Sequence, residues 1–176
     1  MKYSFPLWAS MMANSGDDTF CNLLGNLEKP INPYVELLLW LVQFPRHTLP
    51  AIGLGIGEKI RNPPEHDAKL KSLCESLLKE FQDLLGDDGV FLYPTHPIPA
   101  PFHNKPLFVL FNFAYTGIFN ILGLPATAVP MGVCREEVPI GIQVVGARYS
   151  DRLTLAVALE LEKAFKGWVP PFDVSI

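Results

Sequence analysis

The stretch PIGIQVVGARYSDRLTLAVALELEKAF, residues Pro139 to Phe165, holds the two local signals that decide the fold. Ile140 to Val145 is a short apolar run that predicts a strand. The following residues predict a helix from Asp151 to Phe165, because Ser150 resembles an N-cap and the segment is apolar on most sides. So little of this helix is polar that other elements must cover most of its sides.

A second strand and a helix precede this stretch. Ala126 to Val129 reads as a strand, and the polar loop around Cys134 to Glu137 would join it to the strand that begins near Ile140 as a hairpin. Before it, Phe111 to Leu122 predicts a buried helix that Gly123 caps. The order of elements is therefore helix, strand, strand, helix.

The clearest amphipathic helix lies further upstream. Asn62-Pro63-Pro64 is predicted to interrupt helical structure. The helix predicted from Asp67 to Leu85 has leucines and other apolar residues on one face and charged residues on the other. Gly86 ends it, and Val90 to Tyr93 predicts a short buried strand. This passage from a helix to a strand is typical of an α/β layer. The proline-rich segment from Pro94 to Pro106 must then be an extended coil, of the kind that often lines a site.

The segment from Tyr34 to Ile60 is the most hydrophobic part of the first third. Its first helix should stop near Phe44, because Pro45 lacks an amide hydrogen and disfavours helix before it. Thr48 to Ile60 is either a weak helix or a packed irregular segment. The pair has two readings: core helices of a larger protein, or interfacial helices that touch lipid. Charged residues interrupt the segment, so it does not meet the criterion for a membrane span.

Composition narrows the class of protein. The 176 residues suit one domain, and the net charge of −4 gives no basic surface for nucleic acid. The 3 cysteines are far apart, so neither a disulfide framework nor a zinc site is expected. The first residues lack a continuous signal-peptide core. We therefore expect a cytoplasmic or membrane-associated protein that faces the cytosol, without metal or cofactor.

Common catalytic motifs are missing from the sequence. It has no Gly-x-Ser-x-Gly elbow, no phosphate loop, no dinucleotide-binding glycine pattern and no metal-ligand spacing. Ser76 and Lys79 have the Ser-x-x-Lys spacing, but both lie on the polar face of the amphipathic helix, whereas an activated Ser–Lys pair needs a partly buried lysine. His96 follows a strand, yet no acid or nucleophile accompanies it, so a hydrogen-bonded loop histidine is the favoured reading.

Three ordered segments resemble one family. GDDGVFLYPTHPIPAP (Gly86 to Pro101), FNFAYTGIFNILGLPATAVPMG (Phe111 to Gly132) and the stretch from Pro139 to Phe165 look like the C-terminal third of the amidase-signature hydrolases, in their fatty-acid amide hydrolase branch. The resemblance implies part of an α/β/α fold with a mixed sheet, incomplete on its own. It also implies amide hydrolysis by a lysine and two serines, which lie upstream of the matched region in that family.

The resemblance assigns parts of the chain to this scheme. Residues 1–176 would be the C-terminal part of a single amidase domain, with a hydrophobic cap at 34–60 and the family-motif core at 86–165. The chain would supply sheet core and one wall of the acyl pocket for a fatty-acid amide substrate, and would be inactive alone because no catalytic residue is present. The expected substrate-binding residues are Phe113, Tyr115, Thr116 and Phe119.

Two further expectations concern partners. An exposed strand edge and uncovered apolar faces would favour aggregation or a partner, such as a second copy in a homo-oligomer. By the resemblance, the hydrophobic cap at 34–60 would contact a membrane surface. The alternative to a fragment of an amidase is a non-catalytic lipid-binding or interaction protein derived from one.

Overall fold

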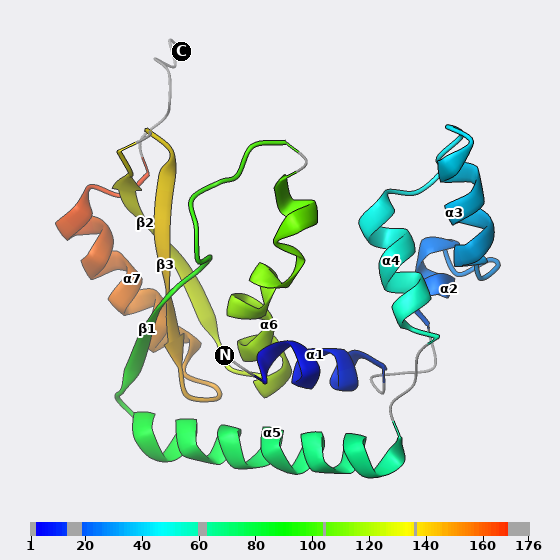
Figure 1. The fold of residues 1–176 in the computed structure, drawn as a ribbon. Helices are drawn as coiled ribbons and strands as arrows, with labels where there is room; N and C mark the ends of the chain where they lie inside the picture. The colour runs from blue at the N-terminus through cyan, green and yellow to red at the C-terminus, as the bar shows by residue number, and fades with distance from the viewer. Residues whose placement is uncertain (1–2, 14–18, 60–62, 104, 136, 169–176) are drawn as a thin grey trace. The chain divides into compact units, whose positions relative to one another are not determined.

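The computed structural model describes residues 3–13, 19–59, 63–103, 105–135 and 137–168 (Figure 1). The chain divides into two compact units. The cap unit is Ala9–Leu70 and contains the predicted cap at 34–60. The sheet unit is Met1–Trp8 with Lys71–Ile176, and it contains the predicted core at 86–165. The assignment of both to one amidase domain stays a prediction.

The sheet unit combines helices and strands, as the sequence predicts for an α/β fold. In chain order the elements are α1 (Ser4–Ala13), α2 (Phe20–Leu24), α3 (Pro33–Leu41), α4 (Leu49–Gly57), α5 (Pro64–Leu85), β1 (Val90–Pro94), the 3-10 helices η1 (Lys105–Phe108) and η2 (Leu110–Phe113), α6 (Ala114–Leu122), β2 (Ala126–Val133), β3 (Pro139–Gly146) and α7 (Asp151–Phe165).

The sheet has three strands in the order β1-β3-β2. β2 and β3 form the predicted hairpin, with Ala126 opposite Val145 and Val129 opposite Ile142. β1 pairs with the other side of β3, again antiparallel. Both neighbouring pairs among the described strands are therefore antiparallel, and the parallel pairs of a mixed sheet do not occur among them. β1 and β2 are the two edges.

Helices cover both faces of this sheet (Figure 1). Successive side chains of a strand point to opposite faces. Thr127 of β2 donates to Thr154 of α7 at 2.9 Å, so α7 lies on one face. Gln143 of β3 points the other way and donates to the backbone oxygen of Tyr115 in α6. The helix–sheet–helix layering that the family resemblance implies is present in this part of the chain.

The core on the α6 face is aromatic. Phe119 of α6 is only 2% exposed, and its ring lies 6.0 Å from that of Phe81 in α5 and 6.3 Å from that of Phe91 in β1. Leu122, also in α6, and Val145 of β3 are fully buried. Phe81, from the apolar stripe predicted on α5, thus packs in the core of the sheet unit.

Three predicted helix boundaries can be compared with the structure. α5 begins at Pro64 instead of Asp67, because a proline fits the first turn of a helix, where no amide hydrogen is needed. The helix predicted from Phe111 to Leu122 is split, since η2 precedes α6. Gly123 caps α6 as predicted, in the left-handed conformation at φ 63°.

Ser150 does not act as the predicted cap. It stands at the N-cap position of α7, but no helix amide donates to its side chain. Its hydroxyl donates to the backbone oxygen of Ala147 instead. The bounds of α7, Asp151–Phe165, agree with the prediction.

In the cap unit, α3 ends at Leu41, before the predicted stop near Phe44. Gln43 ends the helix in the left-handed conformation at φ 63°, and the amide of Phe44 donates back to the oxygen of Leu39 at 2.9 Å, a common helix C-terminal cap. Of the segment from Thr48 to Ile60, Leu49–Gly57 is a helix, α4, as the first of the two alternatives predicts. Ile60 lies outside the described residues. Glu58 accepts hydrogen bonds from the amides of Phe20 and Cys21 at 2.8 and 3.1 Å, and so caps α2.

Candidate functional site

The four residues expected to bind substrate lie where η2 runs into α6. Phe113 is the last residue of η2, and Tyr115, Thr116 and Phe119 lie in α6. The first three are half-buried, while Phe119 is buried. The structure therefore brings Phe113, Tyr115 and Thr116 to one half-exposed turn and directs Phe119 into the aromatic core.

Phe113 belongs to a cluster of aromatic rings that includes α1. Its ring lies 4.6 Å from that of Trp8, edge to face, and 6.2 Å from that of Phe5. Phe5 in turn lies 4.4 Å from Phe111. Gly117 permits this approach, since a Cβ there would stand 3.1 Å from Cδ1 of Trp8. These rings form a continuous apolar surface beside the start of α6.

The sequence does not identify Phe5 and Trp8 as neighbours of the site. The sequence offers one signal for this pair: their spacing of three residues places both side chains on one side of a helix. That signal does not say which part of the chain the helix contacts. Only the folded chain brings α1 against η2.

Tyr115 stacks on Tyr93 of β1, with ring centroids 5.3 Å apart and planes inclined by 30°. Burial, followed by the neighbouring Tyr115, raises the pKa of Tyr93 above its ordinary value. Both rings are half-buried. The pair therefore presents apolar ring surface with two phenolic hydroxyl groups, next to the point where the proline-rich coil leaves the sheet.

Thr116 uses its hydroxyl within its own turn. Its Oγ1 donates to the backbone oxygen of Phe113 at 3.0 Å, which satisfies the donor and leaves the oxygen lone pairs as acceptors. Thr116 thereby fixes the turn that carries Phe113 and Tyr115.

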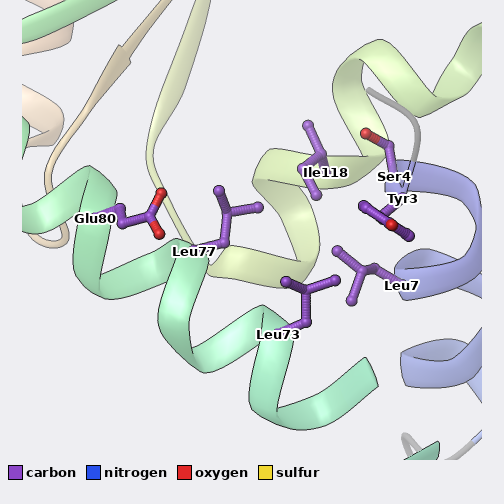
Figure 2. Close-up of a pocket in the computed structure, with 7 residues that line it drawn as sticks. All are labelled: Tyr3, Ser4, Leu7, Leu73, Leu77, Glu80 and Ile118. Carbon is purple, nitrogen blue, oxygen red and sulfur yellow. The ribbon is translucent and has the colours of Figure 1, made fainter. Parts of the chain in front are cut away.

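A small apolar hollow lies close to this site (Figure 2). Its volume is about 170 Å³. It is lined by Tyr3, Ser4, Leu7, Leu73, Leu77, Glu80 and Ile118. Ile118 lies between Thr116 and Phe119 on α6, but none of the four predicted residues lines the hollow. Its lining is mostly apolar and suits an apolar group.

A second, more polar hollow of about 400 Å³ lies at the other end of α6, between Gly123 and Asp151. Arg148 is part of its lining. The guanidinium donates to the backbone oxygen of Leu122 through Nε at 3.2 Å and Nη2 at 2.9 Å. Arg148 is therefore engaged at the C-terminal end of α6, where a cation is favourable.

The side chains considered for catalysis are not assembled into a site. Ser76 and Lys79 are exposed on α5, as expected from the polar face. Nδ1 of His96 lies 2.7 Å from the backbone oxygen of Ile98, so the ring belongs to a local turn. Among the described residues there is no group of three or more metal-binding side chains.

Comparison with known proteins identifies the family. A family model described as Amidase matches residues 45–155, which is more than half of the chain. The chain belongs to the amidase family. It is 51% identical to human fatty-acid amide hydrolase 2, over 97% of this chain and 33% of that protein. It is 47% identical to fatty-acid amide hydrolase 2-A of Danio rerio, over 100% of this chain and 34% of that protein.

The amidase chain therefore spans about a third of the length of these relatives, in their C-terminal part. Solved amidase structures show the same fold. The glutamyl-tRNA(Gln) amidotransferase chain from Thermotoga maritima matches with a TM-score of 0.55 at 21% identity, covering 92% of this chain and 32% of that one. An allophanate hydrolase from Kluyveromyces lactis matches with a TM-score of 0.56 at 19% identity, covering 93% and 29%.

Proposed function

We propose that this amidase chain supplies the sheet core and an acyl-binding wall for the hydrolysis of fatty-acid amides. The observation that carries the proposal is the identity of about half the residues to fatty-acid amide hydrolase 2 over nearly the whole chain. The residues of the wall are Phe113, Tyr115 and Thr116, with Phe119 supporting them from the core.

The surface at the start of α6 suits a long acyl chain. Burying each methylene contributes about 0.8 kcal/mol, so such a ligand needs a continuous apolar surface more than it needs polar contacts. The rings of Phe5, Trp8, Phe111 and Phe113 supply one. The hydroxyl groups of Tyr93 and Tyr115 border it, where the amide group of a ligand would find donors.

Binding of a palmitoyl amide with a dansyl-labelled amine tests the wall. We expect the chain to bind this probe, and Phe113→Ala to weaken binding by about tenfold, since a large apolar contact is lost. Leu84→Ala is the matched control, because Leu84 is also a large apolar residue but is exposed on α5. Equal effects of the two substitutions, or no binding by the wild-type chain, would contradict the proposal.

We propose further that the chain alone does not hydrolyse amides. In the family scheme the lysine and the two serines belong to a segment that this sequence does not match. Ser76 and Lys79 are both exposed on α5, whereas an activated Ser–Lys pair needs partly buried surroundings. A fluorophosphonate probe should leave the isolated chain unlabelled, and labelling of any serine would refute this.

Contact with a membrane surface is proposed for the cap unit. α3 and the residues after it expose large apolar side chains, among them Leu38, Leu41 and Phe44. None of the described helices is long and apolar enough to cross a bilayer. The proposed contact is therefore interfacial, with the exposed apolar residues at the headgroup boundary.

Flotation with phosphatidylcholine vesicles tests the membrane contact. The wild-type chain should float with the vesicles, and Leu41→Glu with Phe44→Glu should leave it in the unbound fraction, since a buried carboxylate is unfavourable in the apolar boundary. Leu84→Glu is the control, because Leu84 is as exposed as Phe44 but lies in α5. Loss of flotation with the control as well would argue against a specific surface.

A further inference from the structure

Gln143 is a buried polar residue in the core of the sheet unit. It lies on β3, the central strand, and is 3% exposed. Its neighbours along the strand, Val144 and Val145, are fully buried. A buried side-chain amide is unfavourable unless its donors are satisfied, so its partners show what the residue does.

Both partners of Gln143 are backbone oxygens at the edge of the candidate site. Nε2 donates to the oxygen of Pro94 at 3.0 Å and to the oxygen of Tyr115 at 2.9 Å. Pro94 is the last residue of β1, where the proline-rich coil begins. Tyr115 lies in the first turn of α6. One side chain therefore links the strand, the coil and the helix that carry the proposed wall.

The same two bonds hold the stacked tyrosines. Tyr93 lies directly opposite Gln143 in the pairing of β1 with β3 and precedes the bonded Pro94. Tyr115 is bonded through its own carbonyl. Losing the amide would release both sides of the stack at once, without removing any ring from the wall.

We propose that Gln143 is the positioning residue of the acyl-binding wall, fixing the start of the proline-rich coil against the first turn of α6. This inference rests on the proposed function of the wall. An effect on packing alone would be shared by any buried polar link in the sheet. The effect on acyl binding would be specific to the link that touches the wall.

The sheet offers a matched control on its opposite face. Thr127 and Thr154 form a hydrogen bond between β2 and α7 that is also partly buried, and this bond lies on the face of the sheet away from the wall. Gln143→Met and Thr127→Val each replace a polar side chain with an apolar one of similar shape. Both should lower stability, and Gln143→Met by more, because it removes two hydrogen bonds while Thr127→Val removes one.

Titration and probe binding then separate the two variants. We expect Gln143→Met to weaken binding of the dansyl-labelled palmitoyl amide by about tenfold, and Thr127→Val by less than about twofold. Gln143→His retains a ring donor and should lie between wild type and Gln143→Met. Because burial and Tyr115 raise the pKa of Tyr93, loosening the stack should let Tyr93 ionise at lower pH. Phenolate absorbance records this change, with Tyr93→Phe to assign it.

The possible results point to different conclusions. Equal weakening by Gln143→Met and Thr127→Val, or an unchanged Tyr93 titration in Gln143→Met, would overturn the role of Gln143. If Gln143→Met does not fold, the comparison of Gln143→His with Thr127→Val decides the same question. Failure of the wild-type chain to bind the probe would instead contradict the acyl-binding function itself.

Discussion

Gly146, at the end of β3, shows how closely α7 approaches the sheet. A Cβ at this position would overlap Oγ of Ser150 and stand 2.9 Å from Cγ2 of Thr154. We expect Gly146→Ala to lower the free energy of unfolding by about 2 kcal/mol, because the backbone or α7 must move to make room. Urea denaturation followed by circular dichroism measures the change.

Gly53 provides the control for this substitution. It lies inside α4, and a Cβ there would meet nothing within 4 Å. Alanine is a better helix former than glycine by about 1 kcal/mol, so Gly53→Ala should be neutral or stabilising. If both alanine substitutions had the same effect, the close contact at Gly146 would not be the cause.

The cysteines should differ in reactivity. Burial raises the pKa of the Cys74 thiol, and burial followed by the Glu58 carboxylate raises that of Cys21. A raised pKa leaves less thiolate at a given pH, so both should alkylate slowly at neutral pH and faster as the pH rises. Cys134 is only half-buried, in the hairpin turn, and should react first.

Mass spectrometry after iodoacetamide treatment measures this order. We expect Cys134 to be labelled at least about tenfold faster than Cys74 in the native chain. In denaturant the difference should vanish, since all three thiols are then exposed. Rapid native labelling of Cys74 would show that the core around α5 opens more readily than its burial suggests.

At the scale of elements, local patterns predicted those parts of the fold that local physics determines. The hairpin and the bounds of α7 follow from strand runs, a polar turn and an apolar helix that are adjacent in sequence. Helix ends near prolines were less predictable. α5 begins at Pro64, whereas the sequence pattern predicts Asp67. α3 ends at Leu41, whereas the predicted end is near Phe44.

Adjacency in sequence also decides which residues of the candidate site the sequence could propose. Phe113, Tyr115 and Thr116 share one short segment, which the family resemblance could point to. Trp8 and Gln143 reach that segment from distant parts of the chain, and no periodic pattern records such contacts. Phe119 is on the same helix but on its core face, a distinction that depends on where β1 and α5 pack.

α7 has one face that nothing in the described chain covers. Leu155 and Leu159 are more than half exposed and lie one helical turn apart, so they form a single apolar stripe. Thr154, on a different side of the helix, is buried against the sheet. We expect this stripe to promote self-association, and Leu155→Glu with Leu159→Glu to shift the chain toward monomer in analytical ultracentrifugation.

Added negative charge alone could also reduce self-association, so the control must add the same charge as the double substitution. Arg152→Glu on the exposed side of α7 adds the same amount of negative charge as the double substitution without removing an apolar residue. Dispersal by Arg152→Glu to the same degree would assign the effect to net charge and not to the stripe.

For the whole molecule, the exposed stripe on α7 and the two edge strands have a common interpretation. The chain spans about a third of the length of its fatty-acid amide hydrolase relatives, and it matches solved amidases over a similar share. We therefore expect the faces that are bare here to be those at which the rest of an amidase domain would pack. A sheet edge and a neighbouring apolar helix bind such a partner through backbone pairing and apolar burial together.

Co-expression tests this interpretation directly. The segment of a fatty-acid amide hydrolase 2 that precedes the matched third should co-purify with this chain and become reactive toward a fluorophosphonate probe, because the sheet and the acyl-binding wall would then be complete. Gly146→Ala, which displaces α7 from the sheet, should reduce co-purification, whereas Gly53→Ala should not. Stable pairing without labelling would favour the alternative of a non-catalytic lipid-binding protein. Absence of any pairing would mean that the bare faces of α7 and the edge strands are not complementary to an amidase domain.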